Sequence, residues 1–291
     1  MPKVSVILPN YNHAKYLPQR IESIFNQSFT DFELIVLDDN SSDNSIEVIE
    51  SYLSDKRFTH FVKNQMNSGS TFIQWEKGIQ LAQGEYIWIA ESDDVAAPSF
   101  LSDCLEKISS TPGVEIVYVP SVWIDENGKE IHSPEHESVE KVWNGNNLIT
   151  SEFLTGNLIY NASSAVFRKD LLKNVDFGAV RTFRYTGDWL FWVQLISNSK
   201  VARLGKRLNY FRRHTGNVSF RSDSEGLLFT EGIRIVNYIL KNYPVTFIAR
   251  RKTALRWAKK LTSAVVTDKQ KVKATLPLEI RLYFTLFNLV K

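Results

Sequence analysis

The sequence predicts an α/β fold: a mostly parallel sheet flanked by helices, followed by a C-terminal helical extension. Two observations predict it. Over the first hundred residues, short apolar runs alternate with single amphipathic helices, which is the pattern of a doubly wound sheet. Beyond residue 222 the apolar spacing is helical and basic residues dominate. The 291 residues, 43% of them hydrophobic, suffice for one large core or two modest ones.

Four strands are predicted in the first third of the chain. Val4–Leu8, Phe32–Leu37 and the weaker Phe58–Lys63 are each followed by a helix with apolar residues on one face. Gly84 is expected to end the third helix. Tyr86–Ala90 is apolar on both faces, as a buried parallel strand is. Because right-handed crossovers carry such strands in one direction, their carboxyl ends should share one edge of the sheet.

Shorter elements are predicted after residue 95. A helix opens at Pro98, where proline is favoured, and Val114–Pro120 and Ser163–Phe167 are strands. Asp125–Gly128 has the Asn-Gly signal of a hairpin turn. Residues 131–145 are polar and predict an irregular loop.

Polar clusters follow three of the predicted strands, at 9–12, 38–43 and 91–94. Asn, Asp and Ser are also ordinary turn residues, so each cluster has a purely structural interpretation. Adjacent acids that close a buried strand nevertheless need a partner. Glu91, Asp93 and Asp94 would repel one another unless a cation or hydrogen-bond donors lay between them, and hard oxygen ligands favour Mg²⁺ or Mn²⁺. The alternative is an acidic loop that happens to follow a strand.

The same strand ends suggest a nucleotide. A carboxylate of Asp38 or Asp39 can accept a hydrogen bond from a nucleobase imide, and Tyr11 offers a flat stacking face. Neither common glycine-rich phosphate loop occurs in the sequence. A bound diphosphate would therefore need a metal to neutralise it, which supports the metal interpretation of Asp93.

Three motifs together resemble the family 2 glycosyltransferases: V-S-V-I-L-P-N-Y-N at 4–12, L-I-V-L-D-D-N-S-S-D at 34–43 and A-E-S-D-D at 90–94. The likeness covers at least residues 3–220. It implies an inverting enzyme of the GT-A fold that uses a nucleotide-diphosphate sugar, with UDP-sugar expected. Residues 1–222 are then the catalytic domain, with a nucleotide-sugar half at 1–95 and an acceptor half at 96–222, before the extension at 223–291.

The resemblance also implies site residues. Asp93 matches the metal-coordinating acid, with His214 as a second ligand of Mn²⁺ or Mg²⁺. Nucleotide-sugar contacts are assigned to Pro9 and to polar residues within the motifs and in later segments: Tyr11, Asn12, Asp38, Asp39, Asn67, Glu91, Ser92, Asp94, Arg212, Arg213 and His214. Two departures stand out. Glu91 replaces the family's usual Asp, and Phe72–Ile79 lacks the arginine of the family's A-R-N-x-G-I pattern.

Asp188 lies where a predicted loop meets an apolar helix. From the residues alone, a helix N-cap is the simpler interpretation. The resemblance implies instead that Asp188 is the general base, which removes the proton of the acceptor hydroxyl as it attacks opposite the leaving diphosphate. A helix N-terminus would favour the ionised carboxylate, whereas aromatic neighbours would oppose ionisation.

The run Asn209–Ser219 resembles the family's Y-R-x-H-x-x-x-x-S element. The resemblance implies that Arg212 or Arg213 binds diphosphate oxygens, and that neutral His214 contacts the phosphate or the metal. The alternative is a solvated basic loop. As a flexible loop, it is expected to close over the bound donor and exclude water.

Charge is uneven along the chain. Residues 241–291 hold 12 basic and 2 acidic residues, a net charge of +10, whereas residues 1–240 hold 23 and 30, a net charge of −7. The basic extension and the apolar segment Leu278–Val290 fit an anionic membrane surface, but equally packing on the catalytic domain or a homodimer. Nucleic acid is disfavoured because no groove-reading element is predicted and the crevice is acidic.

The expected localisation is cytoplasmic, with peripheral association on the inner face of the plasma membrane. One cysteine, Cys104, suits a reducing compartment, and no apolar run approaches the roughly 20 residues of a spanning helix. The expected function is transfer of a sugar to a hydroxyl of a saccharide or lipid-linked acceptor in cell-surface polysaccharide synthesis. The alternatives are a catalytically silent nucleotide-sugar-binding or scaffolding relative and, less favoured without a glycine-rich loop, a nucleotidyltransferase.

Overall fold

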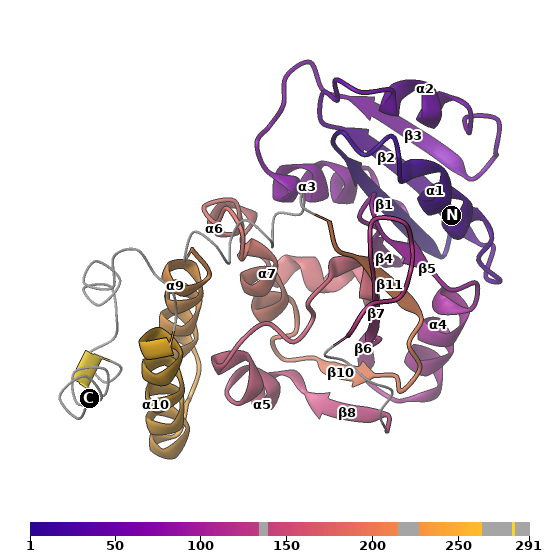
Figure 1. Ribbon diagram of the computed structural model, residues 1–291. Coiled ribbons are helices and arrows are strands. Elements are labelled where there is room, and N and C mark those ends of the chain that lie inside the picture. The colour runs from indigo at the N-terminus through magenta and orange to yellow at the C-terminus, as the bar shows by residue number, and fades with distance from the viewer. Residues whose placement is uncertain (134–138, 215–226, 264–280, 283–291) are drawn as a thin grey trace. The chain divides into compact units, whose positions relative to one another are not determined.

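The computed structural model describes residues 1–133, 139–214, 227–263 and 281–282 (Figure 1). They divide into two compact units. The sheet unit comprises Met1–Trp143, Ile159–Phe177 and Ser199–Arg213. The helical unit comprises Asn144–Leu158, Gly178–Asn198 and the described part of His214–Lys291. The domain boundary predicted at residue 222 lies outside the described residues.

A large, mostly parallel sheet organises the sheet unit. Its strands are β1 (Val4–Asn10), β2 (Phe32–Asp38), β3 (Phe58–Lys63), β4 (Tyr86–Ile89), β6 (Val114–Tyr118), β8 (Lys141–Asn144), β9 (Ala165–Arg168) and β10 (Lys200–Arg203). Their order is β3-β2-β1-β4-β9-β6-β10-β8. β1 is parallel to β2 and β4, β2 to β3, and β6 to β10, whereas β9 is antiparallel to β4 and β6. The predicted α/β fold class is confirmed.

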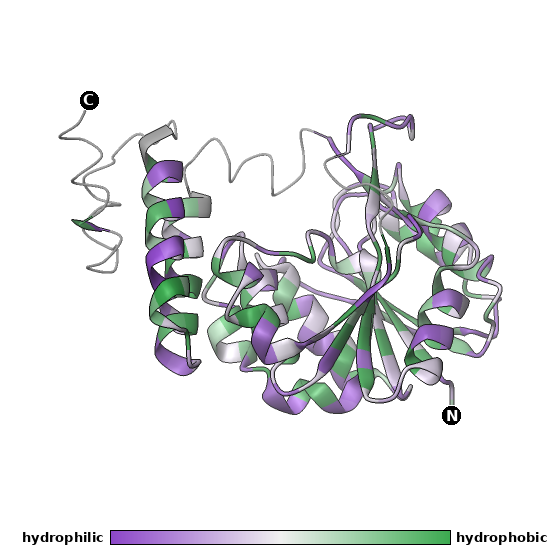
Figure 2. Cartoon of the chain, turned by 90° about the horizontal axis from the view of Figure 1, so that it is seen from below, coloured by the Kyte–Doolittle hydropathy of each residue, from purple (hydrophilic) through white to green (hydrophobic). Residues whose placement is uncertain are grey.

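Helices cover both faces of this sheet. On one face α1 (Leu17–Phe25), α2 (Ser45–Glu50) and α4 (Phe100–Ser110) share a core with Val4, Val6 and Leu8 of β1. On the other face α3 (Thr71–Leu81) brings Gly78 against Ile7 of β1. In Figure 2 hydrophobic residues recur along the central fan of strands. The alternation of β1 side chains thus buries both faces, which explains its unbroken apolar run.

A second, three-stranded sheet joins distant parts of the chain. Its strands are β5 (Val95–Ala96), β7 (Ser121–Ile124) and β11 (Asn209–Arg212), in the order β5-β11-β7. β11 is antiparallel to β5 and parallel to β7. Because β5 begins directly after Asp94, this sheet brings the end of β11 to the acidic residues that follow β4.

Two local expectations are corrected. α3 ends at Leu81 with Ala82 in an extended conformation, so Gly84 does not end the helix. Gly84 is instead required by close packing, because an added Cβ would lie 2.5 Å from the backbone nitrogen of Ser5. The predicted loop over 131–145 is also partly wrong, since 141–144 form the edge strand β8.

The remaining elements are short, apart from two long helices near the C-terminal end. They are α5 (Gly145–Ile149), α6 (Phe177–Val180), α7 (Gly187–Leu195), α9 (Leu227–Asn242), α10 (Phe247–Ser263) and the 3₁₀ helices η1 (Glu152–Leu154), η2 (Ala162–Ser164) and η3 (Lys169–Asn174). Within the helical unit α7 is buried on nearly all sides, and its Trp189 ring stacks on Trp257 of α10 at 6.3 Å. Among the residues that the structure describes, no helix has both the length and the apolar composition needed to cross a membrane.

Candidate active site

The predicted polar clusters of the sheet unit meet at one edge of the sheet. The parallel register pairs Asn10 with Asp38 and Ile7 with Ile89, so β1, β2 and β4 end together. Tyr11 follows β1 with 47% of its surface exposed, as a stacking face requires. Asn12 has a φ of 54°, in the left-handed region that asparagine tolerates.

Asp38 is held entirely by its neighbours. Its Oδ1 accepts hydrogen bonds from Asn10 Nδ2 at 2.8 Å and Ser41 Oγ at 2.6 Å, and its Oδ2 accepts one from the Ser41 backbone N–H at 2.9 Å. Only 1% of Asp38 is exposed. The Ser41 hydroxyl also accepts the Asn12 backbone N–H at 2.9 Å. Asp38 therefore shapes the loop that presents Tyr11 and Asn12.

Asp39 is bound by residues between 64 and 74, of which only Asn67 was expected at the site. Its carboxylate accepts hydrogen bonds from Asn64 Nδ2 at 2.6 Å, Gln74 Nε2 at 2.8 Å, and both the backbone N–H and the hydroxyl of Ser68. Asn67 Nδ2 donates to the Asp39 backbone carbonyl at 3.0 Å. These donors fix the side chain at the edge of the sheet. A polar residue beside the apolar face of α3, Gln74, was the available signal.

Glu91 and Asp94 flank Asp93 and are each tied to protein donors. Glu91 Oε1 accepts the indole N–H of Trp75 at 2.8 Å. Burial, followed by the charge of Asp93, raises the pKa of Glu91 to about 8. Asp94 Oδ2 accepts hydrogen bonds from Asn161 and Ser163, both at 2.7 Å. Burial and then Asp93 raise the pKa of Asp94 to about 7.

Asp93 lies at the centre of this loop, 8% exposed. A carboxylate oxygen of Asp93 and a ring nitrogen of His13 lie within 4.8 Å of each other. His13 Nδ1 is 2.8 Å from Ser92 Oγ, which orients the ring. His13 was not expected at the site, although it lies two residues after Tyr11 in the loop that follows β1. Imidazole and carboxylate together form a donor set that suits a divalent transition metal.

Arg212 is hydrogen-bonded to the backbone of the acidic loop. Its Nε donates to the Asp93 backbone carbonyl at 2.7 Å, its Nη1 to the Asp125 carbonyl at 3.0 Å, and its Nη2 to Gln19 Oε1 at 2.6 Å. Only 2% of the residue is exposed. The guanidinium is thus turned into the protein. Arg213 is half-buried and lies over the Trp123 ring at 4.8 Å.

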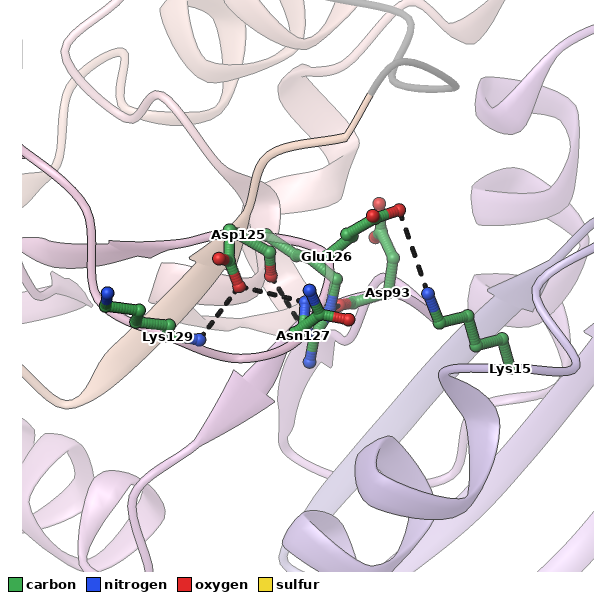
Figure 3. Close-up of polar contacts among 7 residues, drawn as sticks. Lys15, Asp93, Asp125, Glu126, Asn127 and Lys129 are labelled. Atoms are coloured by element: carbon green, nitrogen blue, oxygen red, sulfur yellow. Dashed lines mark hydrogen bonds and ion pairs between the residues drawn. The ribbon is translucent and has the colours of Figure 1, made fainter.

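The hairpin turn after β7 lies beside Asp93 (Figure 3). Asp125 Oδ1 accepts the backbone N–H groups of Asn127 and Lys129, both at 2.9 Å, which closes the turn. The exposed Glu126 lies 3.7 Å from Lys15. The close-up shows the carboxyl groups of Glu126 and Asp93 reaching toward the same region. The turn therefore adds a surface carboxylate near the acidic loop.

Arg20 is a second residue that the motifs did not mark. It is fully buried on α1, and its guanidinium lies 4.9 Å from the centre of the Trp88 ring. Within the described residues, none of its three guanidinium nitrogens has a hydrogen-bond partner. Burial lowers the pKa of Arg20 to about 10, against the attraction of Asp94, Asp93 and Glu91. Arg20 remains charged at neutral pH and offsets part of the negative charge. A basic residue on an apolar helix face was the available signal.

Asp188 belongs to the helical unit. α7 begins at Gly187 with Thr186 as its N-cap residue, so Asp188 lies in the first turn rather than at the cap. Its Oδ2 accepts a hydrogen bond from Asn157 Nδ2 at 2.8 Å. Burial raises the pKa of Asp188 to about 7, and hydrogen bonds from the Trp189 backbone and Asn157 limit that rise. A carboxylate with such a pKa is matched to proton transfer near neutral pH.

Comparison with known proteins gives a consistent result. The family model described as Glycosyl transferase family 2 matches residues 5–176. An uncharacterised glycosyltransferase of Methanocaldococcus jannaschii is 31% identical over 203 residues, which cover 68% of this chain and 66% of that protein. The Staphylococcus aureus poly(ribitol-phosphate) β-N-acetylglucosaminyltransferase TarP is 28% identical over 219 residues, 72% of this chain and 62% of TarP. The matched regions therefore span slightly under two thirds of these relatives.

A solved structure resembles the whole fold. The crystal structure of Staphylococcus aureus TarS residues 1–349 in complex with UDP-GlcNAc matches with a TM-score of 0.68 at 20% sequence identity. The match covers 97% of this chain and 78% of the TarS chain. At this identity the likeness establishes the fold, which is the GT-A fold expected from the sequence.

Proposed function

The chain belongs to glycosyltransferase family 2, and we propose that it is an inverting, metal-dependent enzyme that uses a nucleotide-diphosphate sugar, with a UDP-sugar as the expected donor. The acceptor is a hydroxyl group of a saccharide or of a lipid-linked acceptor in cell-surface polysaccharide synthesis. The relative TarP, named for N-acetylglucosamine transfer to poly(ribitol-phosphate), supports an acceptor of this class.

The pairing of Asp93 with His13 carries this proposal. The two side chains offer a carboxylate oxygen and a ring nitrogen within 4.8 Å, at the carboxyl end of the central strands. This donor set fits Mn²⁺ or Mg²⁺, with Mn²⁺ favoured by the imidazole. When bound, the cation would neutralise charge on the diphosphate leaving group. Asp93 and His13 would hold it, and His214, which directly follows Arg213, is proposed as a further ligand.

The nucleotide is proposed to bind along the edge formed by β1 and β2. Tyr11 would stack on the base, and Asp39 would accept a hydrogen bond from it, exchanging the Ser68 hydroxyl for the ligand donor. Pro9, Asn12 and Asn67 would shape this edge. For the diphosphate, Arg213 is favoured over Arg212, because the Arg212 donors are bound to protein carbonyls and Gln19.

Asp188 is the proposed base. The acceptor oxygen attacks the anomeric carbon as the bond from that carbon to the diphosphate oxygen breaks, and the hydroxyl proton passes to the Asp188 carboxylate. One displacement without a covalent enzyme intermediate inverts the anomeric centre. Since the pKa of Asp188 is about 7, roughly half of the free enzyme holds the ionised base at neutral pH.

Helix α10 supports the proposed contact with an anionic membrane surface. Phe247 and Ile248 at its start are 71% and 67% exposed. Exposed cations continue along the helix: Arg251, Lys252, Arg256 and Lys259. Apolar side chains beside a row of cations match the interface of an anionic bilayer. The apolar segment predicted at 278–290 lies almost wholly outside the described residues, and a homodimer remains the competing proposal.

Donor binding tests the proposed metal site. We expect UDP-sugars with Mn²⁺ to raise the melting temperature of the purified protein, since a ligand at 100 times its Kd adds about 2.7 kcal/mol to the unfolding free energy. Asp93→Asn should lose this Mn²⁺-dependent stabilisation. Asp31→Asn, an exposed residue preceding the opposite end of β2, is the matched control and should keep it. Equal stabilisation of Asp93→Asn and the wild type, or full stabilisation in excess chelator, would contradict the site.

Turnover separates an enzyme from a silent relative. Release of UDP from a stabilising UDP-sugar, with water as acceptor, should require Asp188, and Asp188→Asn should lower the rate by about 10²–10⁴-fold while leaving donor binding intact. Metal-dependent donor binding without any turnover of the wild type would favour the nucleotide-sugar-binding alternative.

A further inference from the structure

Helix α9 reaches the segment that carries Asp188 through one buried carboxylate. Glu231 is 7% exposed, and its Oε1 accepts the Arg184 backbone N–H at 2.8 Å. Its Oε2 accepts the backbone N–H groups of Tyr185 and Thr186 at 3.0 and 2.9 Å, and the Thr186 hydroxyl at 3.1 Å. Three consecutive amides and a hydroxyl thus converge on one side chain. Such charge-assisted hydrogen bonds are stronger than neutral ones.

This contact replaces the usual local cap of α7. Thr186 is the N-cap residue, yet its side chain makes no capping hydrogen bond to α7, because its hydroxyl donates to Glu231. The path of the chain into the first turn is therefore set by a residue 45 positions later. Asp188 lies two residues beyond this anchor, so its backbone position depends on α9.

Helix α10 holds the other partner of Asp188. Asn157, which donates to Asp188 Oδ2, follows a segment whose carbonyl groups are bound by α10. Trp257 Nε1 donates to the Leu154 carbonyl at 2.8 Å, and Lys260 Nζ donates to the Thr155 carbonyl at 2.7 Å. Two hydrogen bonds from α10 therefore fix the backbone at Leu154 and Thr155. Asn157, whose side chain contacts Asp188, follows two residues later.

Helices α9 and α10 also pack together against Trp189, the residue next to Asp188. The Trp257 ring stacks on Trp189, with 13° between the ring planes. Gly232, adjacent to Glu231, makes this possible, because an added Cβ would lie 2.8 Å from the Trp257 ring and 3.0 Å from the Trp189 ring. The same small group of residues thus couples α7, α9 and α10.

We propose that Glu231 and Asn157 are positioning residues for Asp188, and that α9 and α10 form a clamp that sets the orientation of this carboxylate. The proposal rests on the proposed role of Asp188 as general base. It assigns the C-terminal helices a part in the reaction, in addition to any contact that they make with a membrane or a second copy.

Titration of Asp188 tests the clamp without a substrate. The carboxyl resonance of Asp188, labelled with ¹³C and assigned by its absence in Asp188→Asn, reports the pKa directly. Glu231→Gln removes a negative charge and loosens the segment, so the titration midpoint should fall by about half a pH unit or more. Asn157→Ala removes a donor to the ionised form and should raise the midpoint by about one pH unit. Glu152→Gln, an exposed charge change in the same unit, should leave it unchanged.

Hydrogen exchange gives a second measurement, on the wild type itself. The amides of Arg184, Tyr185 and Thr186 should be strongly protected although they precede the helix. Glu231→Asp should retain part of this protection and Glu231→Gln should lose it. Unprotected wild-type amides would overturn the proposal, as would an unchanged Asp188 midpoint in both Glu231→Gln and Asn157→Ala.

Release of UDP from UDP-GlcNAc with Mn²⁺ distinguishes a failure of the proposed clamp from a failure of the proposed base. Glu231→Gln and Asn157→Ala should each lower kcat at least tenfold with little change in KM, and Glu231→Asp should recover part of the rate. If Asp188→Asn keeps wild-type turnover, the role of Asp188 as base fails. If Asp188→Asn abolishes turnover while both other variants keep the wild-type rate and pH profile, only the clamp fails.

Discussion

The raised pKa of Asp188 should appear in the stability of the protein. Burial raises this pKa from an ordinary value of 3.8 to about 7, so the folded state holds a proton that the unfolded chain releases between these values. The unfolding free energy should therefore fall as pH rises from about 4 to about 7, and then level off. Asp188→Asn keeps the shape of the side chain and removes the titration.

The size of the effect follows from the two pKa values. Relative to an unperturbed aspartate, Asp188 costs about 2 kcal/mol at pH 5 and about 4 kcal/mol at pH 8, a difference of about 2–3 kcal/mol. The side chain keeps some solvent exposure, which lowers the penalty. The unfolding free energy of Asp188→Asn minus that of the wild type should thus increase by about 1–3 kcal/mol when the pH is raised from 5 to 8.

Urea denaturation at the two pH values measures this difference. Tryptophan fluorescence is a suitable signal, since Trp189, Trp192 and Trp257 all lie buried in the helical unit. Glu152→Gln, which removes an exposed carboxylate from the same unit, is the control and should show no such pH dependence. An equal stability difference between Asp188→Asn and the wild type at both pH values would refute the reasoning.

In turnover, the same pKa predicts that kcat/KM falls about tenfold per pH unit below 7, because the base must be ionised.

Two further predictions concern packing and the membrane. Gly84→Ala should lower the unfolding free energy by about 1–3 kcal/mol, because the new Cβ would meet backbone atoms that cannot move aside, whereas Gly156→Ala, with open space around it, should be nearly neutral in the same denaturation experiment. Replacing Phe247 and Ile248 together by serine should weaken flotation with anionic vesicles at least tenfold, since each buried apolar side chain contributes about 1.5–3 kcal/mol. Leu53→Ser, which removes an exposed apolar side chain outside α10, should float as the wild type does. Equal flotation of the wild type, the double variant and Leu53→Ser would rule out α10 as the contact.

Much of the sheet was predictable because its strands are specified locally. β3 has its predicted bounds, and β1 and β2 extend their predicted ranges by one or two residues. An unbroken apolar run is required when helices cover both faces, so the pattern itself states the burial. The position of β9 between β4 and β6 was not predictable in this way. Strand order depends on pairing between segments far apart in sequence, and a local apolar pattern carries no information about its partner.

The candidate site likewise contains residues that the local sequence predicts and partners that it does not. Acids at strand ends could be predicted because their type and position are visible in the sequence. Their hydrogen-bond partners could not be predicted. Trp75 donates to Glu91 and Gln74 donates to Asp39, both from a helix whose sequence indicates only packing against the sheet. Arg212 illustrates the limit most clearly. The motif suggested an arginine facing a diphosphate, whereas the fold turns its donors toward backbone carbonyls.

The contacts of Arg212 have a consequence for the growing chain. Its guanidinium binds Gln19, 193 residues earlier, and the carbonyl of Asp93, 119 residues earlier. β1 to β4 can pair as soon as they leave the ribosome, but the loop that carries Asp93 lacks its support until residue 212 has been made. Contacts at such separation in sequence cost more loop-closure entropy than local ones and slow folding. A chain that stops before residue 212 would hold the acidic residues without the contacts that support their loop, so the proposed cation site would form only after this residue has been made.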